Sequence, residues 1–337
     1  MWSETDFEPV KKLKVGIIGD FCLDVYWTAD MKKSELSRET PHYPLPVIEE
    51  RMSPGGAGNV AVNVSSLGVG AVYAIGCIGN DWRGKALSEQ LALNGIHTEG
   101  LVTCDGRFTN TYIKPIRCGI SDVKYEDPRL DFENYETIND ETEESILQAL
   151  LSLQDKIDIL CVCDQMKYGC ITDKLRQKIS ELGKSGRKII VDSRDRISLY
   201  SNVTVKPNEV EAARAMGTDD LHSAVKLLSQ KNQKPAIVTL GDKGCLVSDG
   251  VATYEIPAFE VEPPIDFCGA GDTFMAAFGT FWASGFEPEK AALFANAASA
   301  VTIKKIGTTG SATIREILDT GPRALTILPR LSSSSRM

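Results

Sequence analysis

A glycine turn beside a carboxylate, at residues 266–273, is the strongest chemical signal in this chain. The segment reads Asp-Phe-Cys-Gly-Ala-Gly-Asp-Thr and precedes a long run of helix-forming residues. Gly269 and Gly271 allow a tight turn and a close approach of the backbone to an anion, and the N–H groups at a helix start favour a bound phosphate. Asp272 beside such a phosphate is placed to take a proton from an attacking hydroxyl, which predicts a general base for phosphoryl transfer. The alternative is an ordinary strand-to-helix turn with Asp272 as its N-cap.

A second glycine cluster, at residues 53–61, predicts contacts to a molecule rich in hydroxyl groups. Gly55 and Gly56 allow close backbone approach, and Asn59 offers both an amide donor and a carbonyl acceptor. Asp24 follows the first apolar strand, at the sheet edge where open α/β sheets bind ligands. A sugar would suit this set of groups. The alternative is tight helix–sheet packing with Asn59 as a helix cap.

Two further segments suit the phosphates and ribose of a nucleotide. Asn208 and Glu211, three residues apart at a predicted helix start, could hold hydrated magnesium, although the same pair also satisfies a capping box. The turn at residues 239–244 follows a predicted strand and can line a phosphate, although a plain hairpin turn explains it nearly as well. Both alternatives stay open at the level of sequence.

Composition narrows the class of protein. The chain has 337 residues, 42% hydrophobic content and a net charge of −9, which indicates a globular protein with a large core. An acidic balance without a basic run argues against nucleic acid and membrane partners, and the charged N-terminus without a signal-peptide core indicates the cytoplasm. The nine cysteines form no zinc-type or thioredoxin-type pair, so we expect buried, reduced thiols. Three histidines leave little material for a histidine metal site or a Ser-His-Asp triad.

Apolar runs alternate with helical patterns along the chain, which predicts an α/β sandwich with a mostly parallel central sheet. We expect the main strands at residues 13–19, 72–78, 157–163, 188–192, 203–205 and 236–240. Two segments depart from this alternation of strands and helices, at about 25–51 and 108–135, and we expect them to form a small β lid outside the main sheet. One domain is expected over residues 1–327, followed by a disordered tail over 328–337.

Two apparent nucleotide motifs are incomplete. Residues 79–86 have Walker A spacing up to the lysine, but Ala86 replaces the Ser or Thr that would hold magnesium, so a turn with a helix start is expected. Gly56 and Gly58 lack the third glycine and the flanking pattern of a dinucleotide fingerprint, so NAD binding is not expected.

Taken together and in this order, the motifs resemble the ribokinase-like (PfkB) carbohydrate kinases over nearly the whole chain, from about Lys14 to about Ile317. Segments 19–27, 129–133, 294–298 and 305–308 are most similar to the heptose-phosphate kinase branch, whose members phosphorylate the anomeric hydroxyl of a seven-carbon sugar phosphate. The resemblance implies a three-layer α/β/α sandwich, ATP as donor, Mg²⁺, often a monovalent cation such as K⁺, and a β lid that mediates a homodimer.

The resemblance also implies roles for individual residues. Asp272 matches the catalytic base, and the backbone of Gly269, Ala270 and Gly271 matches the anion hole. The sugar-contacting positions are Asp24, Gly55, Gly56 and Asn59, with Lys167, Arg117 and Arg129 as candidates for holding a substrate phosphate. Thr239, Gly241, Gly244 and Asn296 match the nucleotide pocket, Asn208 and Glu211 match the residues that organise magnesium through water, and Asp266 matches the region of a monovalent cation.

Several departures from the family pattern bear on the substrate. Phe267 and Cys268 stand where hydroxyl side chains are common, and the first lid segment is longer, with Arg38 and His42 added. A kinase for another sugar, sugar phosphate or nucleoside is therefore the alternative. A non-catalytic sugar- or nucleotide-binding regulator is a further alternative, against which the presence of Asp272 argues. The chain ends without the nucleotidyltransferase domain of some heptose kinases, so we expect one reaction.

Overall fold

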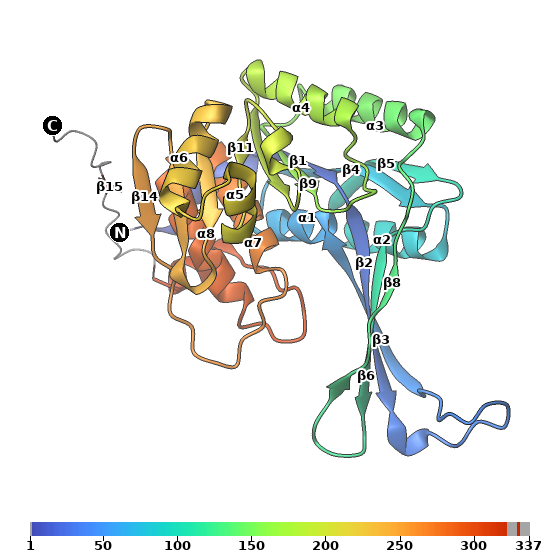
Figure 1. Ribbon diagram of the computed structural model, residues 1–337. Coiled ribbons are helices and arrows are strands. Elements are labelled where there is room, and N and C mark those ends of the chain that lie inside the picture. Colours follow the sequence, from blue (N-terminus) through green and yellow to red (C-terminus); the bar gives the residue numbers. More distant parts are fainter. Residues whose placement is uncertain (1, 322–328, 331–337) are drawn as a thin grey trace.

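A mostly parallel sheet forms the centre of the computed structural model, which describes residues 2–321 and 329–330 (Figure 1). Seven strands run parallel: β1 (Lys14–Gly19), β4 (Ala71–Gly79), β5 (Ile96–Cys104), β9 (Ile159–Asp164), β10 (Lys188–Ser193), β11 (Thr204–Val205) and β12 (Ala236–Thr239). One edge is antiparallel, with β13 (Cys245–Ser248), β14 (Thr253–Ile256) and β15 (Pro329–Arg330). Across the sheet the order is β15-β14-β13-β12-β11-β10-β9-β1-β4-β5.

Helices cover both faces of this sheet and make it the middle layer of three. One face packs against α1 (Ala57–Ser66), α2 (Trp82–Leu93), α7 (Ala270–Ala283), α8 (Pro288–Thr302) and α9 (Ile314–Asp319), and the other against α3 (Asp140–Leu153), α4 (Asp173–Lys184), α5 (Glu209–Met216) and α6 (Leu221–Asn232). Because side chains alternate along a strand, Ile17 enters the first core and Ile18 the second. The expected α/β/α sandwich is confirmed.

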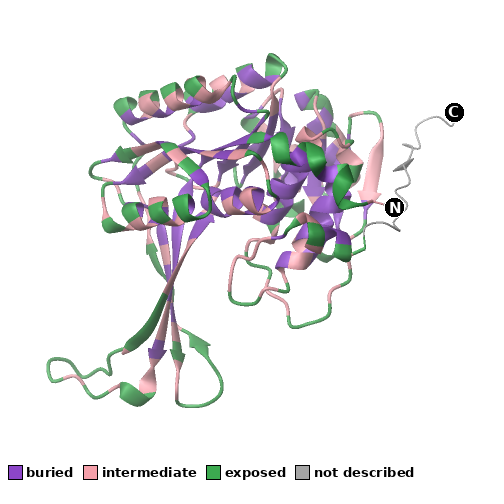
Figure 2. Ribbon diagram, turned by 180° about the vertical axis from the view of Figure 1, so that it is seen from behind, coloured by how far each residue is buried: buried purple, intermediate pink, exposed green. Residues whose placement is uncertain are grey.

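Five further strands form a second sheet that extends from the body as a lid. They are β2 (Phe21–Asp30), β3 (Val47–Gly56), β6 (Thr111–Cys118), β7 (Tyr125–Glu126) and β8 (Leu130–Phe132). Strand β2 pairs with β3 on one side and with β6 on the other, which places Asp24 opposite both Ser53 and Tyr112. Residues near the body are mostly buried and those at the far end are mostly exposed (Figure 2). The sheet therefore has a foot at the main body and a free tip.

Glycines, and not polar residues, cap the two helices that begin at the foot of the lid. Helix α7 has Gly269 as its N-cap, with φ of 80°, and α1 has Gly56, with φ of 55°. The alternatives in which Asp272 or Asn59 is the N-cap are therefore wrong: each lies in the first helical turn, with its side chain available for other contacts.

The other turns follow local sequence rules. Residues 79–86 cover the end of β4, a turn at 80–81 with Asp81 as N-cap, and the start of α2, and residues 239–244 connect the antiparallel strands β12 and β13. No helix in the described ranges is long and apolar enough to span a membrane. Most of the predicted tail, 328–337, lies outside the described residues; the two that are described, 329 and 330, form β15.

Candidate active site

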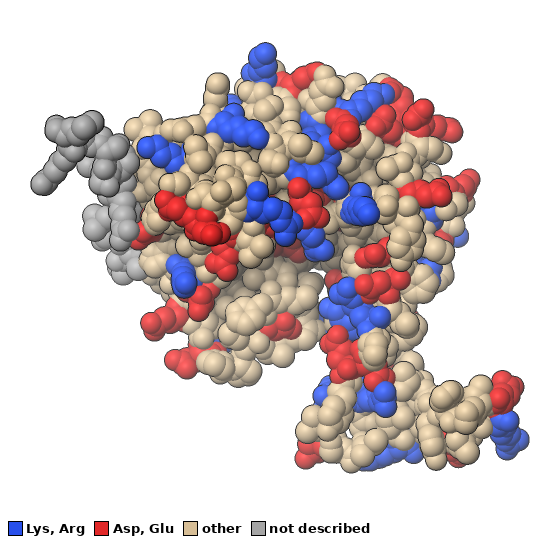
Figure 3. Space-filling view, in the orientation of Figure 1, with Lys and Arg blue, Asp and Glu red and all other residues tan. Residues whose placement is uncertain are grey.

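A cavity of 630 Å³ lies where the foot of the lid meets the carboxyl ends of the parallel strands. Its walls come from the lid strands, from the first turns of α1 and α7, and from the loops after β9 and β10. Basic and acidic side chains lie close together where the lid leaves the body (Figure 3). Eight residues predicted from sequence line the cavity, namely Asp24, Gly55, Gly56, Asn59, Arg129, Lys167, Gly269 and Asp272.

Asp272 is held in this cavity by a neighbour from the other glycine cluster. Asn59 Nδ2 donates a hydrogen bond of 2.8 Å to Asp272 Oδ2. Burial raises the pKa of the Asp272 carboxyl to about 6, with a further upward contribution from Asp192, while the Asn59 hydrogen bond and Lys206 act in the opposite direction. A carboxyl with this pKa is ionised at neutral pH and still basic enough to take a proton.

The turn before Asp272 requires glycine. A Cβ on Gly269 would lie 2.6 Å from Asn59 Nδ2, and its φ of 80° is a left-handed conformation that other residues rarely adopt. Gly271 is exposed, and a Cβ there would meet only Lys206 Nζ, at 4.0 Å. Gly271 therefore borders open space next to Asp272, whereas the Ala270 N–H donates a hydrogen bond of 3.2 Å to the Phe267 carbonyl oxygen.

Lys206 and Asp192 form a buried ion pair behind this turn, with 2.9 Å between Nζ and Oδ2. Burial alone would lower the pKa of Lys206, but the facing Asp192 raises it above its ordinary value, with help from Glu211 and Asp272. The sequence analysis did not select either residue. Their positions in the sequence could have indicated a role in the site, because Asp192 is near the end of β10 and Lys206 directly follows β11. Both strand ends lie at the ligand-binding edge of the sheet.

Asp24 is a buried carboxylate on the lid side of the cavity. Burial raises its pKa, while Lys114, Arg129 and Arg51 act to lower it. A Cβ on Gly55 would lie 2.7 Å from Asp24 Oδ2, so the glycine leaves room for this carboxylate. The arrangement suits the acceptance of hydrogen bonds from hydroxyl groups.

Four cationic side chains line the same cavity: Lys114, Arg129, Lys167 and Arg194. Arg129 makes two hydrogen bonds to Asp131, at 2.6 and 2.7 Å, and lies over the Tyr112 ring, 4.4 Å from its centre. Lys114 and Arg194 were not selected from sequence. The pairing of β6 with β2, which places Lys114 opposite Tyr26 and two residues beyond the pair of Tyr112 and Asp24, joins segments far apart in the chain and leaves no local pattern.

Arg117, a predicted phosphate contact, is not in this cavity. It lies further along β6, lines a separate hollow nearer the lid tip, and binds Asp127 at 2.5 Å. It is three positions after Lys114 on β6, and over this distance the strand extends away from the body. The structure therefore replaces Arg117 by Lys114 as the cation of β6 at the site.

Asn208 and Glu211 form a complete capping box at the start of α5. Glu211 Oε2 accepts a hydrogen bond of 2.8 Å from the Asn208 N–H, and Asn208 Oδ1 accepts one of 2.9 Å from the Glu211 N–H. Burial raises the pKa of Glu211, and Asp192 adds to this effect. Residues 2–321 contain no cluster of His, Cys, Asp or Glu that could hold a metal ion by itself. This donor set fits a hydrated Mg²⁺ bound mainly through phosphate oxygens, with a carboxylate nearby.

Of the residues expected in a nucleotide pocket, Thr239 lies beside this cap, while Gly244 and Asn296 lie at the end of β14. Thr239 forms a single β-bridge with Asn208. A Cβ on Gly244 would lie 2.1 Å from the Ile256 carbonyl oxygen, whereas Gly241 faces open space with φ of 60°. Asn296 is buried and donates to the carbonyl oxygens of Ile256 and Pro257, at 3.2 and 3.0 Å, so its amide N–H groups hold the end of β14.

Asp266 connects two loops next to the glycine turn. Its carboxylate accepts hydrogen bonds of 3.0 Å from the N–H groups of Cys268 and Gly307. Arg51 of the lid strand β3 donates to the Gly307 carbonyl oxygen. The Cys268 thiol is exposed and lines the cavity, because a turn bordering a cavity leaves side chains uncovered. Cys77 and Cys118 are half-buried, so the expectation that all the cysteines are buried is wrong at these three positions.

Comparisons with known proteins point to one family. The family profile described as pfkB family carbohydrate kinase matches residues 17–315. The bifunctional protein HldE of Desulfatibacillum aliphaticivorans is 30% identical over 309 residues, covering 88% of this chain and 60% of that protein. The bifunctional protein HldE of Bradyrhizobium diazoefficiens is 33% identical over 303 residues, covering 86% and 59%. The chain thus spans about 60% of the length of these curated relatives.

Solved structures share the fold at lower identity. Phosphofructokinase-2 from Escherichia coli in complex with potassium superposes with a TM-score of 0.72 at 21% identity, covering 91% of this chain and 98% of that one. Ribokinase from Arabidopsis thaliana complexed with ribose and ATP gives a TM-score of 0.66 at 20% identity, covering 92% and 98%. The ribokinase-like architecture expected from sequence is confirmed.

Proposed function

The chain belongs to the pfkB family of carbohydrate kinases and carries an ATP-dependent kinase domain, and on that premise we propose that it phosphorylates a hydroxyl of a sugar phosphate, of the heptose 7-phosphate type, with Asp272 as general base. The observation that carries the proposal is the placement of Asp272. Its carboxylate lies in the cavity at the first turn of α7, bound to Asn59 and next to the exposed glycine turn.

The chemistry follows from these groups. The acceptor hydroxyl lies within reach of Asp272, which takes its proton while the oxygen attacks the terminal phosphorus of ATP and the bond from that phosphorus to the bridging oxygen breaks, so that ADP leaves. The N–H groups at the start of α7 and the buried Lys206 offset the negative charge that develops on the transferred group. Asp24 and Asn59 orient the sugar by hydrogen bonds, and closure of the lid excludes water that would otherwise hydrolyse ATP.

Magnesium fits beside Asn208 and Glu211. When bound with ATP, it would neutralise phosphate charge. Glu211 would hold the hydrated ion through water, while Thr239, Gly241 and Gly244 line the nucleotide. Asp266 keeps the loop at Gly307 next to the glycine turn, which supports a monovalent-cation site such as K⁺ in this region.

The cationic side chains of the cavity support a phosphorylated acceptor. Lys114, Arg129, Lys167 and Arg194 line the cavity together with the carboxylates Asp24, Glu133, Asp195 and Asp272, and four cations beside these carboxylates suit a phosphate group. The resemblance of several segments to heptose-phosphate kinases favours a seven-carbon sugar phosphate. A kinase for another sugar phosphate remains the second candidate, because the lengthened lid segment with Arg38 and His42 departs from that branch.

ADP release tests the proposal. The purified protein is incubated with ATP and Mg²⁺ and with a panel of sugars and sugar phosphates that includes heptose 7-phosphate, alongside Asp272→Asn and the matched control Asp155→Asn, which changes an exposed carboxylate paired with Arg187. We expect turnover with one sugar phosphate, lost in Asp272→Asn and kept in the control. Turnover with unphosphorylated sugars alone would refute the acceptor class, and full turnover of Asp272→Asn would refute the base.

We further propose that the lid mediates a homodimer. Its outer part exposes Val47, Ile48, Ile120, Val123 and Tyr125, an apolar set that another copy of the lid could cover. Light scattering would give a dimer for the wild type and a monomer for Ile48→Asp combined with Val123→Asp. A monomeric wild type would contradict this arrangement.

Use of ATP as donor also supports the cytoplasm as the place where the protein works.

A further inference from the structure

The loop that carries Lys167, residues 165–170, is bound through its backbone to buried charged side chains. The Asp20 carboxylate accepts hydrogen bonds from the N–H groups of positions 165, 166 and 170, at 2.9, 2.8 and 2.8 Å. Arg107 donates to the carbonyl oxygen of Tyr168 at 2.8 Å. A Cβ on Gly169 would lie 2.1 Å from Asp20 Oδ1, so this carboxylate needs a glycine in the loop. The loop thus has little freedom to shift.

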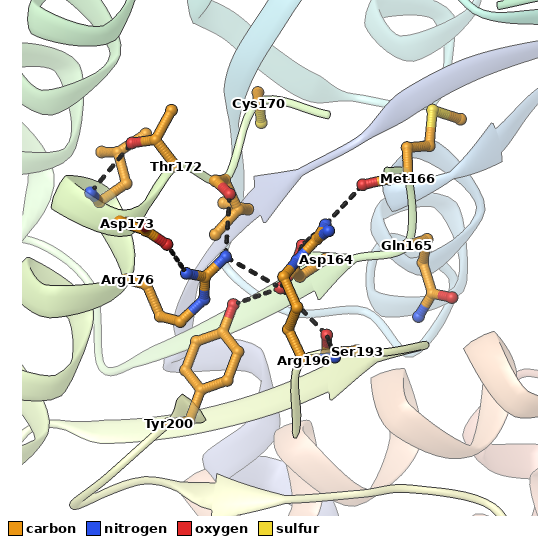
Figure 4. Close-up of polar contacts among 12 residues, drawn as sticks. Asp164, Gln165, Met166, Cys170, Thr172, Asp173, Arg176, Ser193, Arg196 and Tyr200 are labelled. Carbon is orange, nitrogen blue, oxygen red and sulfur yellow. Dashed lines mark hydrogen bonds and ion pairs between the residues drawn. The ribbon is translucent and has the colours of Figure 1, made fainter. Parts of the chain in front are cut away.

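A second buried carboxylate, Asp164 at the end of β9, holds the same loop through an arginine. Arg196 binds Asp164 with Nε at 3.2 Å and with Nη2 at 2.5 Å, and the same Nη2 donates to the carbonyl oxygen of Met166 (Figure 4). Asp164 also accepts from Ser193 Oγ and from the Tyr200 hydroxyl, each at 3.0 Å. Arg196 is therefore a fixed bridge between Asp164 and the loop.

Asp164 also fixes the neighbouring loop, which follows β10 and carries Arg194. Ser193 Oγ, bound to the Asp164 carboxylate, accepts the Arg196 N–H at 3.2 Å, and the Arg194 N–H donates to the Asp164 carbonyl oxygen at 3.3 Å. Lys167 and Arg194 both line the cavity. One buried residue thus connects the two loops that supply cations from the main body.

We propose that Asp164 and Arg196 are positioning residues, which hold Lys167 and Arg194 in place to bind the phosphate group of the acceptor. This rests on the proposed function, in which the acceptor is a sugar phosphate. A buried carboxylate with two nearby arginines, Arg196 and Arg176, costs desolvation energy that apolar packing would avoid, so a purely structural role explains it poorly. A cationic site gains affinity when its charges are ordered before the ligand arrives.

A double-mutant cycle between Arg196→Lys and Lys167→Ala tests the inference. Lysine keeps the charge at position 196, but a single ammonium cannot reproduce the planar fork that bridges Asp164 and the Met166 carbonyl oxygen. Two quantities are measured: the KM for the sugar phosphate that is turned over, and the Kd for inorganic phosphate by calorimetry, which needs no catalysis.

Each single variant should raise both constants by about tenfold, the effect of losing one charged hydrogen bond, while kcat stays within about twofold. The double variant should lose less affinity than the product of the two single effects, because part of the Arg196 effect acts through the loop that presents Lys167. Arg187→Lys, in an exposed ion pair with Asp155, is the matched control and should change neither constant. Should Arg196→Lys fail to fold, Tyr200→Phe removes one hydrogen bond to Asp164 and should shift both constants in the same direction.

The outcomes separate this inference from the proposed function. Additive effects in the cycle, a loss confined to kcat, or no binding of phosphate by the wild type would overturn the positioning role. The wild type could bind inorganic phosphate, and the variants could show the non-additive loss of affinity, while no sugar phosphate is phosphorylated. That result would support the positioning role and contradict the proposed acceptor.

Discussion

Asn59 Nδ2 donates a hydrogen bond of 2.8 Å to Asp272 Oδ2, and these residues are 213 positions apart in the chain. Each lies in the first turn of a helix that begins with a glycine, α1 for Asn59 and α7 for Asp272. The contact joins the wall proposed to hold the sugar to the group proposed to take its proton. The Asn59 amide therefore affects both the position of the acceptor sugar and the pKa of the Asp272 carboxylate.

Replacing Asp272 by asparagine should lower activity and raise stability in a pH-dependent way. Without the base, we expect kcat to fall by roughly 10²–10⁴-fold. Burial raises the pKa of Asp272 to about 6 in the folded protein, so the folded state holds this proton more tightly than the unfolded state does. The resulting loss of folding stability in the wild type is small at pH 4 and complete above about pH 6. The variant should melt at a higher temperature than the wild type at pH 8.

Thermal unfolding at pH 4 and pH 8, together with steady-state kinetics, checks this prediction. Asp155→Asn, at an exposed position, should change neither quantity. Equal melting temperatures for Asp272→Asn and the wild type at pH 8 would contradict a buried charge at this site.

The pH profile of kcat/KM should follow the ionisation of Asp272. Because the base must be deprotonated, kcat/KM should fall as the pH drops below about 6, the pKa that burial gives this carboxyl. Asn59→Ala removes the hydrogen bond that lowers this pKa, so the descending limb should move to higher pH. Asn94→Ala, at an exposed helix end, is the control. A profile that Asn59→Ala leaves in place would show that another group is being titrated.

Local patterns predicted much of this molecule. The alternation of apolar runs and helical periods indicated the parallel sheet, and the breaks in that rhythm indicated the lid strands. The glycine clusters at 55–58 and 269–271 mark turns that a side chain would block, as the close approach of a Gly269 Cβ to Asn59 shows. The need for glycine can be predicted from sequence, because it depends on the local conformation of the backbone.

Other parts of the site depend on pairings that leave no local signal. Lys114 reaches the cavity because β6 lies beside β2, and nothing in the sequence around residue 114 distinguishes it from Arg117 on the same strand. The buried pair of Lys206 and Asp192 joins two strand ends, and its chemical meaning appears only when β10 and β11 are adjacent. The hydrogen bond between Asn59 and Asp272 likewise required the packing of α1 against α7.

Lys114 and Arg117 provide a matched test of the phosphate contacts. Lys114→Ala should raise the KM for a sugar phosphate by about tenfold or more, because it removes a cation from the cavity wall. Arg117→Ala, on the same strand but outside the cavity, should leave this KM unchanged. Steady-state kinetics at constant ionic strength would measure both. A larger effect of Arg117→Ala would show that the acceptor extends toward the lid tip.

Glu211→Gln should increase the Mg²⁺ concentration that gives half-maximal activity. The glutamine still accepts the Asn208 N–H and so preserves the capping box, but it lacks the negative charge that attracts a hydrated cation. We expect a rise of about tenfold, from the loss of one water-mediated charge contact, with little change in the melting temperature. Titration of Mg²⁺ at fixed ATP measures it, with Glu209→Gln, an exposed neighbour in the same helix, as control. An unchanged requirement for Mg²⁺ would remove Glu211 from the magnesium site.

Substitutions at Lys206 and Asp192 should separate what this ion pair contributes to stability from what it contributes to catalysis. Lys206→Met alone leaves Asp192 as an unpaired buried charge, which should destabilise the protein by about 3–5 kcal/mol. Adding Asp192→Asn removes that charge, so the double variant should recover much of the lost stability. Its activity should remain low, because no ammonium then lies behind Gly271 to offset charge on the transferred phosphoryl group. Urea unfolding and ADP release on the same three proteins measure the two effects. A double variant that recovers both stability and turnover would confine the pair to folding.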